Sequence, residues 1–166
     1  MTKSEGIALD SEINPGNRII VEDNMGISAW HIMRDKVSVG PEATATEVTM
    51  KIISSGLAAM PVVNENHELL GVVSENAILD AIREKKDLDN ITAASITVPA
   101  PIVVDAGTPV DELINLLLKS CCSIVTVLND NKYVGVVSRH MLMDILTSPH
   151  YARFTAKDRK APFACR

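Results

Sequence analysis

Short apolar runs separated by polar turns recur along the middle of the chain. Met60 to Val63 and Leu69 to Ser74 flank one polar turn, and Ile124 to Leu128 and Tyr133 to Ser138 flank another. Both turns are rich in Asn and Asp, which tolerate the left-handed backbone conformation that tight hairpins need. The pattern therefore predicts two β-hairpins.

Apolar residues at helical spacing precede and follow each hairpin. Before the first hairpin, Val48, Ile52 and Ile53 would share one face of a helix near Thr46 to Ser55. The other predicted helices are Pro109 to Ser120, Glu75 to Lys86, and Arg139 to about Thr147. Thr44 and Thr108 are predicted N-caps, because a threonine hydroxyl can accept from an unpaired backbone N–H. Short strands, Val37 to Val39 and Ile102 to Val104, would lead into these helices.

The two sets of elements form an internal repeat. Gly71-Val72-Val73-Ser74 recurs 64 residues later as Gly135-Val136-Val137-Ser138, and Asp80 matches Asp144 at the same offset. The order β-α-β-β-α, given twice, predicts an α/β (α+β) fold. Neither half of about 60 residues would bury enough surface alone, so the halves should pack together. We divide the chain into an N-terminal arm (1–26), repeat 1 (27–86), repeat 2 (91–148) and a C-terminal tail (149–166).

Composition and charge narrow the class of partner. The chain is 46% hydrophobic but only 3% aromatic, so its core must be aliphatic. The net charge is −5, with +4 in the tail and −9 in the remainder, which disfavours a nucleic-acid surface. The basic tail is either a solvated terminus or a contact for an acidic partner. No apolar run has the length of a membrane span.

Cysteine usage points to the cytoplasm. Cys121, Cys122 and Cys165 form neither a disulfide framework nor a metal-ligand spacing. The adjacent pair enters an apolar strand, and we expect both thiols to be buried as small hydrophobic groups. No metal site is expected. Trp30 would cover the edge of the core or anchor an interface, and the first role is favoured.

Aligned with each other at this offset, the two repeats resemble a pair of cystathionine beta-synthase (CBS) domains. The resemblance rests on Ile32-Met33, Gly56-Leu57, Met60-Pro61-Val62-Val63 and both Gly-Val-Val-Ser segments, although repeat 2 has Val125 in place of the proline. It implies a flat disk with a pseudo-twofold axis, two clefts between sheets, and frequent dimerisation. It also implies binding of AMP, ADP, ATP or S-adenosylmethionine and regulation of a partner protein. With no room for a catalytic domain, a stand-alone sensor that needs no cofactor is expected, not an enzyme.

The resemblance places the ligand where the third strand of a repeat meets its last helix. Ser74 and Ser138 lie there, and a helix N-terminus can bind a phosphate, although an ordinary N-cap explains both serines equally well. The family has an aspartate three positions after the serine to grip the ribose, whereas this chain has Ala77 and Met141. The better site by this argument comprises Thr97, Val98, Pro99, Ala100, Ile124, Val125, Ser138, Arg139 and His140. The weaker one comprises Met33, Val37, Met60, Pro61, Ser74 and Asn76.

Other assignments stay open. Without its aspartates the module could be a degenerate pair that binds no nucleotide and serves as a dimeric protein–protein adaptor. Asp80 and Asp144, one helical turn beyond the missing carboxylates, would pair with basic side chains or cap solvent-facing positions. Ser138, His140 and Asp144 contain the residue types of a hydrolase triad, but all three share one helix, which disfavours that assignment.

Overall fold

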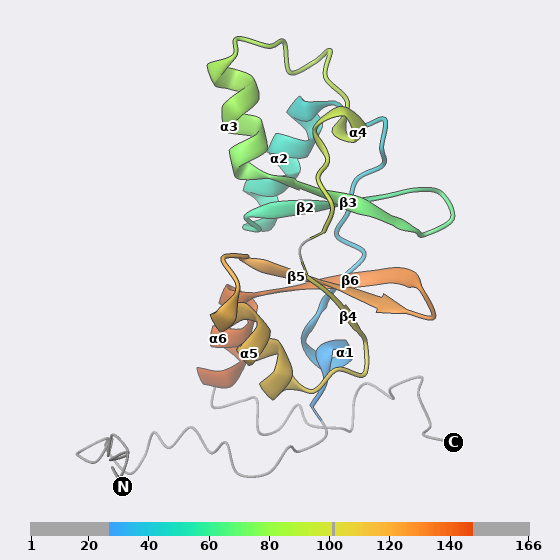
Figure 1. Ribbon diagram of the computed structural model, residues 1–166, viewed down its shortest axis with the longest axis vertical. Coiled ribbons are helices and arrows are strands. Elements are labelled where there is room, and N and C mark those ends of the chain that lie inside the picture. The colour runs from blue at the N-terminus through green and yellow to red at the C-terminus, as the bar shows by residue number, and fades with distance from the viewer. Residues whose placement is uncertain (1–26, 101, 148–166) are drawn as a thin grey trace, which may run out of the picture.

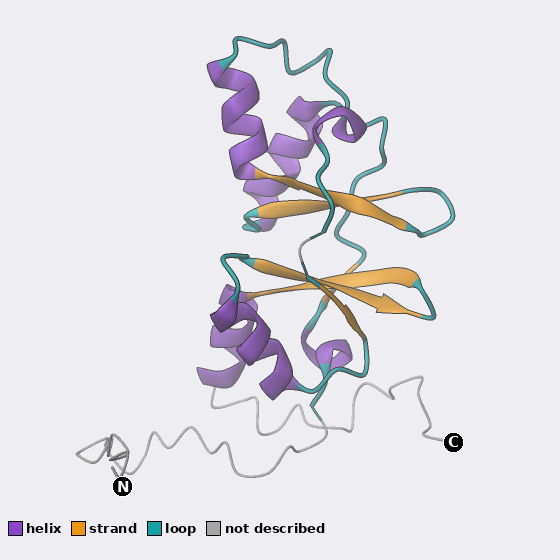
Figure 2. Ribbon diagram, in the orientation of Figure 1, coloured by secondary structure: helices purple, strands orange, loops and turns teal. Residues whose placement is uncertain are grey.

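Two layers of sheet face each other, with helices on both outer sides (Figures 1 and 2). The computed structural model describes residues 27–100 and 102–147. The helices are α1 (Ala29–Ile32), α2 (Ala45–Ser55), α3 (Glu75–Arg83), α4 (Ala93–Ile96), α5 (Val110–Lys119) and α6 (Arg139–Thr147). The strands are β1 (Arg34–Asp35), β2 (Ala59–Val63), β3 (Leu69–Ser74), β4 (Val103–Asp105), β5 (Ile124–Asn129) and β6 (Lys132–Ser138). The predicted α/β class and both hairpins are confirmed.

Each repeat contributes the segment at its own start, here called its leading segment, to the sheet of the other repeat. β1 of repeat 1 pairs with β6 of repeat 2, Arg34 lying opposite Val136, in a sheet of order β1-β6-β5-β4. In return, Val98 of repeat 2 pairs with Val72 of β3 through two backbone hydrogen bonds of 2.9 and 3.0 Å. The predicted strand Val37 to Val39 is reduced to a single bridge between Val39 and Val62. Each sheet is therefore completed by residues from the other repeat.

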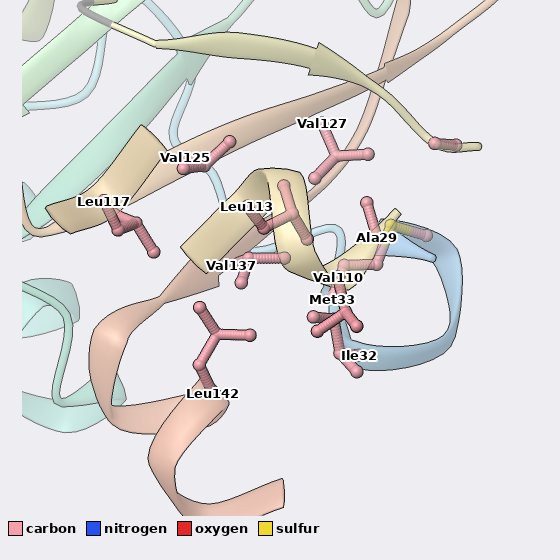
Figure 3. Packing of buried hydrophobic residues seen from close by; sticks show 11 residues of the cluster. Ala29, Ile32, Met33, Val110, Leu113, Leu117, Val125, Val127, Val137 and Leu142 are labelled. Atoms are coloured by element: carbon pink, nitrogen blue, oxygen red, sulfur yellow. The ribbon is translucent and has the colours of Figure 1, made fainter. Parts of the chain in front are cut away.

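The same exchange is seen in the helix-facing cores, the two clusters of buried residues that lie between each sheet and its helices. Ala29, Ile32 and Met33 are buried among residues of α5, β5, β6 and α6, as Figure 3 shows. Conversely, Ala93 of α4 is buried in the core of repeat 1, and its N–H donates to Ala43 O at 2.7 Å. Neither α1 nor α4 was predicted, because four residues are too few to show a helical period. The partly buried Trp30 packs against the repeat 2 core, as predicted.

The sheets meet through a third core. Leu57, Ala59, Val72, Ile124 and Val136 are buried in it, which confirms that the halves pack together. Two polar contacts reinforce it: the buried Tyr133 hydroxyl donates to Val37 O at 2.7 Å, and Lys132 pairs with Glu68 at 3.3 Å. The Asn64 amide and the Lys132 ammonium hold the pKa of the Glu68 carboxyl below its usual value.

Glycine occurs where a crossing segment touches the sheet. A Cβ on Gly71 would lie 2.5 Å from Thr97 Cγ2 and closer still to the Val98 carbonyl oxygen. A Cβ on Gly135 would lie 2.7 Å from Arg34 O and 2.9 Å from Met33 Sδ. The repeated glycine that revealed the duplication is thus the residue that lets each leading segment pass.

Local predictions have mixed outcomes. Thr44 caps α2: its hydroxyl accepts from Glu47 N at 3.2 Å, and the Glu47 carboxylate accepts from Thr44 N at 2.8 Å. Thr108 is not an N-cap, because α5 begins at Val110 and Pro109 occupies its N-cap position.

Two burial predictions are wrong. Ile53 is 75% exposed, since it lies on the outer side of α2 rather than beside Val48 and Ile52. Cys121 is exposed and Cys122 only half-buried, because both precede the first buried residue of β5. The predicted N-terminal arm (1–26) and the basic C-terminal tail (149–166) lie outside the described residues.

Candidate functional site

Two strand-to-helix junctions carry the predicted serines. Ser74 ends β3 and caps α3, its hydroxyl accepting from Ala77 N at 3.2 Å. Ser138 ends β6 and precedes α6, its hydroxyl accepting from Met141 N at 3.2 Å. Both serines therefore have the N-cap role predicted from the sequence. Ser138 is buried, whereas Ser74 is half-buried.

Neither junction has a carboxylate where the family uses one. The residues three positions after the serines are Ala77 and Met141, both half-buried. Asp80 does not replace the missing group, because it pairs with Arg83 at 2.9 Å on the exposed side of α3. The prediction that Asp80 meets a basic side chain is confirmed. Asp144 is exposed on α6.

The exchange of leading segments separates the residues of the better predicted site. Thr97 and Val98 lie against Gly71 and Val72, at the Ser74 junction rather than at the Ser138 junction. Ala100 packs against the core between the sheets, and Pro99 is exposed. Ile124 lies directly opposite Ser138 in the β5–β6 ladder and so stays with it. Val125 belongs to the helix-facing core, which puts it on the other face of the sheet.

The weaker predicted site is divided in the same way. Met33 is buried beside Gly135, close to the Ser138 junction. Met60 is fully buried in the helix-facing core of repeat 1, and its neighbour Pro61 is buried in β2. Val37 packs at the edge of the core between the sheets. Asn76 is exposed in the first turn of α3, next to Ser74.

Arg139 does not face the ligand position inferred from the sequence. Its Nη2 donates to Leu117 O at 2.6 Å and to Ser120 O at 2.7 Å, so the guanidinium caps the C-terminal end of α5. Such a cap is favourable because the last carbonyls of a helix lack partners and carry partial negative charge. His140, the next residue, is exposed.

Arg34 is the basic residue that the sequence analysis missed. It lies in β1, directly opposite Val136 of β6, and Val136 precedes Ser138 by two residues. Its Nη1 donates to Ser55 O at 2.6 Å, at the end of α2. The 64-residue offset pairs Arg34 with Val98, and that match would have drawn attention to it if the exchange had been foreseen.

Other features of the described residues are unrelated to the serines. A pocket of about 610 Å³ is lined by residues 40–43 and 63–66, none of them in either predicted site. Within residues 27–100 and 102–147 there is no group of three or more His, Cys, Asp or Glu arranged to hold a metal ion. In the same ranges no helix is long and apolar enough to cross a membrane.

The chain belongs to the CBS domain family, whose model matches residues 29–84 and 93–148. An uncharacterized protein, MK0525 of Methanopyrus kandleri, is 26% identical over 132 residues, which are 78% of this chain and 66% of the relative. The chain thus spans just under two thirds of that protein's length. The matching family model describes a domain, and it indicates no enzyme family.

Solved structures show the same fold. CBSX2 in complex with AMP is 22% identical with a TM-score of 0.61, covering 71% of this chain and 94% of that one. The CBS domain of a bacterial CNNM/CorC family Mg²⁺ transporter in complex with ATP is 23% identical with a TM-score of 0.60, covering 73% and 87%. At these identities the likeness concerns the fold alone.

Proposed function

We propose that this chain is a regulatory CBS pair that binds an adenosine-containing ligand at the Ser138 junction and modulates a partner protein. AMP, ADP, ATP and S-adenosylmethionine are the candidate ligands. The supporting observation is the buried serine at the start of a nine-residue helix, beside the contact between the two sheets. Helix N-termini favour phosphate, and related folds are solved with AMP and ATP.

The affinity should be modest. Ala77 and Met141 cannot accept hydrogen bonds from ribose hydroxyls as a carboxylate does. Losing one hydrogen bond to a charged group costs about 1.5–3 kcal/mol, which is about one to two decades in the dissociation constant. We therefore expect binding that is detectable by calorimetry but weaker than that of a module with an intact aspartate.

Calorimetry with AMP, ADP, ATP and S-adenosylmethionine tests the proposal. One of these ligands should bind, and at a hundredfold excess over its dissociation constant it should stabilise the fold by about 2.7 kcal/mol. Ser138→Ala should weaken that binding, whereas Ser74→Ala, which loses an equivalent N-cap in the other repeat, should not. Absence of heat and of thermal shift at millimolar concentration with all four ligands would reject nucleotide sensing.

The alternative is a dimeric adaptor that binds no nucleotide, and one observation favours it. The outer side of repeat 1 exposes Met50 (66%) and Ile53 (75%) on α2, and Leu79 (60%) and Ile82 (51%) on α3. Exposed apolar groups gathered on adjacent helices are typical of an interaction surface. We propose that a second copy of the chain covers this surface, so that the adaptor would be a homodimer.

Light scattering coupled to gel filtration tests the dimer. Ile53→Glu should shift the protein toward the monomer mass. Leu118→Glu, at a residue 77% exposed on α5, is the matched control and should leave the mass unchanged. A wild type that elutes as a monomer, or an unchanged mass for Ile53→Glu, would reject this surface. We further propose that the module acts in the cytoplasm, as its cysteine usage leads us to expect, and that its partner is a protein rather than nucleic acid or membrane.

A further inference from the structure

Arg34 and Ser138 extend from the same face of one sheet. In an antiparallel pair, residues opposite each other point to one face, and side chains two apart along a strand share that face. Arg34 lies opposite Val136, and Ser138 is two residues beyond Val136. Val136 is buried in the core between the sheets. The face that carries Arg34 and Ser138 is therefore the one turned toward repeat 1.

The hydrogen bond of Arg34 agrees with this orientation. Its guanidinium reaches Ser55 O in repeat 1, at 2.6 Å. Arg139, in contrast, reaches the end of α5, a helix that packs on the other face of the sheet. Arg139 and Arg34 thus start close to Ser138 in the fold but point to opposite sides of the sheet.

The Ser74 junction has the same backbone plan and a different charge. The residue that crosses beside β3 there is Val98, which pairs with Val72 just as Arg34 pairs with Val136. Val98 is 47% exposed and apolar, and Glu75 follows Ser74 directly. The duplicated fold therefore has one junction with a cation and one with an aliphatic side chain in the equivalent position.

We propose that Arg34 recognises the phosphate of the ligand, so that an anionic ligand selects the Ser138 junction over the Ser74 junction. The inference rests on the proposed function and names the specificity-determining residue within it. A guanidinium carries five N–H donors in a planar fork that suits phosphate, and Ser55 O occupies only one direction of that fork. α6 begins directly after Ser138, so its N-terminus adds partial positive charge at the end of the strand that pairs with β1.

Two ligands that differ by one phosphate isolate the role of Arg34. AMP and adenosine are titrated calorimetrically into the full chain, its Arg34→Gln variant and an Arg83→Gln variant. Arg83 is an exposed residue of α3, so its substitution makes the same change in net charge away from the junction. We expect Arg34→Gln to weaken AMP binding about tenfold or more, with adenosine binding unchanged, because a charged hydrogen bond is lost only with AMP. Arg83→Gln should change neither.

The outcomes separate the two proposals. Equal AMP affinity for Arg34→Gln and wild type, while wild type binds AMP, would overturn the role of Arg34 and leave nucleotide sensing intact. Two equivalent AMP molecules per chain would overturn the preference for one junction. A wild type that binds neither AMP nor adenosine overturns this inference, and the proposed function fails with it only when ADP, ATP and S-adenosylmethionine also do not bind. Because Arg34→Gln also removes the bond to Ser55 O, retained adenosine binding is the check on its fold, and Arg34→Lys, which keeps charge without the fork, should lie between the two.

Discussion

Replacing Gly71 by alanine tests the crossing of the leading segments. The added Cβ would lie 2.5 Å from Thr97 Cγ2 and nearer still to the carbonyl oxygen of Val98, which is backbone and cannot rotate away. Gly71 also has φ +154°, where an L residue is strained. Overpacking costs about 1–3 kcal/mol and backbone strain about 1–3 kcal/mol, so we expect a loss of roughly 2–6 kcal/mol. That is a large part of the stability of a small domain, which is about 5–15 kcal/mol.

Urea denaturation followed by circular dichroism measures this loss. Gly40→Ala is the control for glycine itself, because its Cβ would meet nothing within 4 Å. Gly56→Ala controls for positive φ alone, since Gly56 has φ +67° and also has open space. Gly71→Ala should be the most destabilised of the three. If it lost no more stability than Gly56→Ala, the close approach of Val98 to β3 would be refuted.

Two further changes test the local structure. Thr44→Ala should lower the free energy of unfolding by about 1 kcal/mol in urea titrations because it removes the cap of α2, whereas Thr108→Ala should not, since Thr108 caps nothing. Burial raises the pKa of the Tyr133 hydroxyl above its usual 10.0, so the folded chain keeps a proton that the unfolded chain loses. The stability so contributed is complete below about pH 10 and is lost as the pH rises further. Tyr133→Phe should flatten that alkaline decline and cost about 1 kcal/mol at neutral pH; an unchanged decline would count against the assignment.

The secondary structure within each repeat was predictable because its signals are local. Alternation, helical spacing and polar turns placed four long helices and both hairpins close to their observed bounds. The duplication added the prediction that the halves pack together. The exchange was not predictable from a single sequence: β1 has two residues, and its partner Val136 is about a hundred residues away. Ile53 was misplaced because the spacing of apolar residues fixes the buried face of a helix only to within one residue. Thr108 was misplaced because the same spacing fixes the first residue of a helix no better.

The sequence predicted the positions of the two serines at strand-to-helix junctions, but not which residues surround each junction in space. Ser74 and Ser138 were found because the motif repeats, and Ala77 and Met141 because a position can be counted from the motif. The flanking segments were assigned to the wrong junctions, since each repeat was treated as self-contained. Arg139 was proposed because it follows Ser138 in the chain, and Arg34 was not considered, since its place beside β6 depends on strand pairing that the sequence does not reveal.

The exchanged segments also bear on the order of events in folding. A contact between Arg34 and Val136 closes a loop of about 100 residues, and such closure is entropically costly and slow compared with a hairpin. During synthesis, α1 and β1 emerge long before β6, the strand with which β1 pairs. The edge of β3 likewise stays unpaired until Val98 has been made. Docking of β1 and α1 onto the β5–β6 hairpin is therefore a late step that joins both repeats into one cooperative unit. A chain cut within residues 84–92 after folding should stay assembled, whereas either half made alone would present an unfilled core and an open sheet edge.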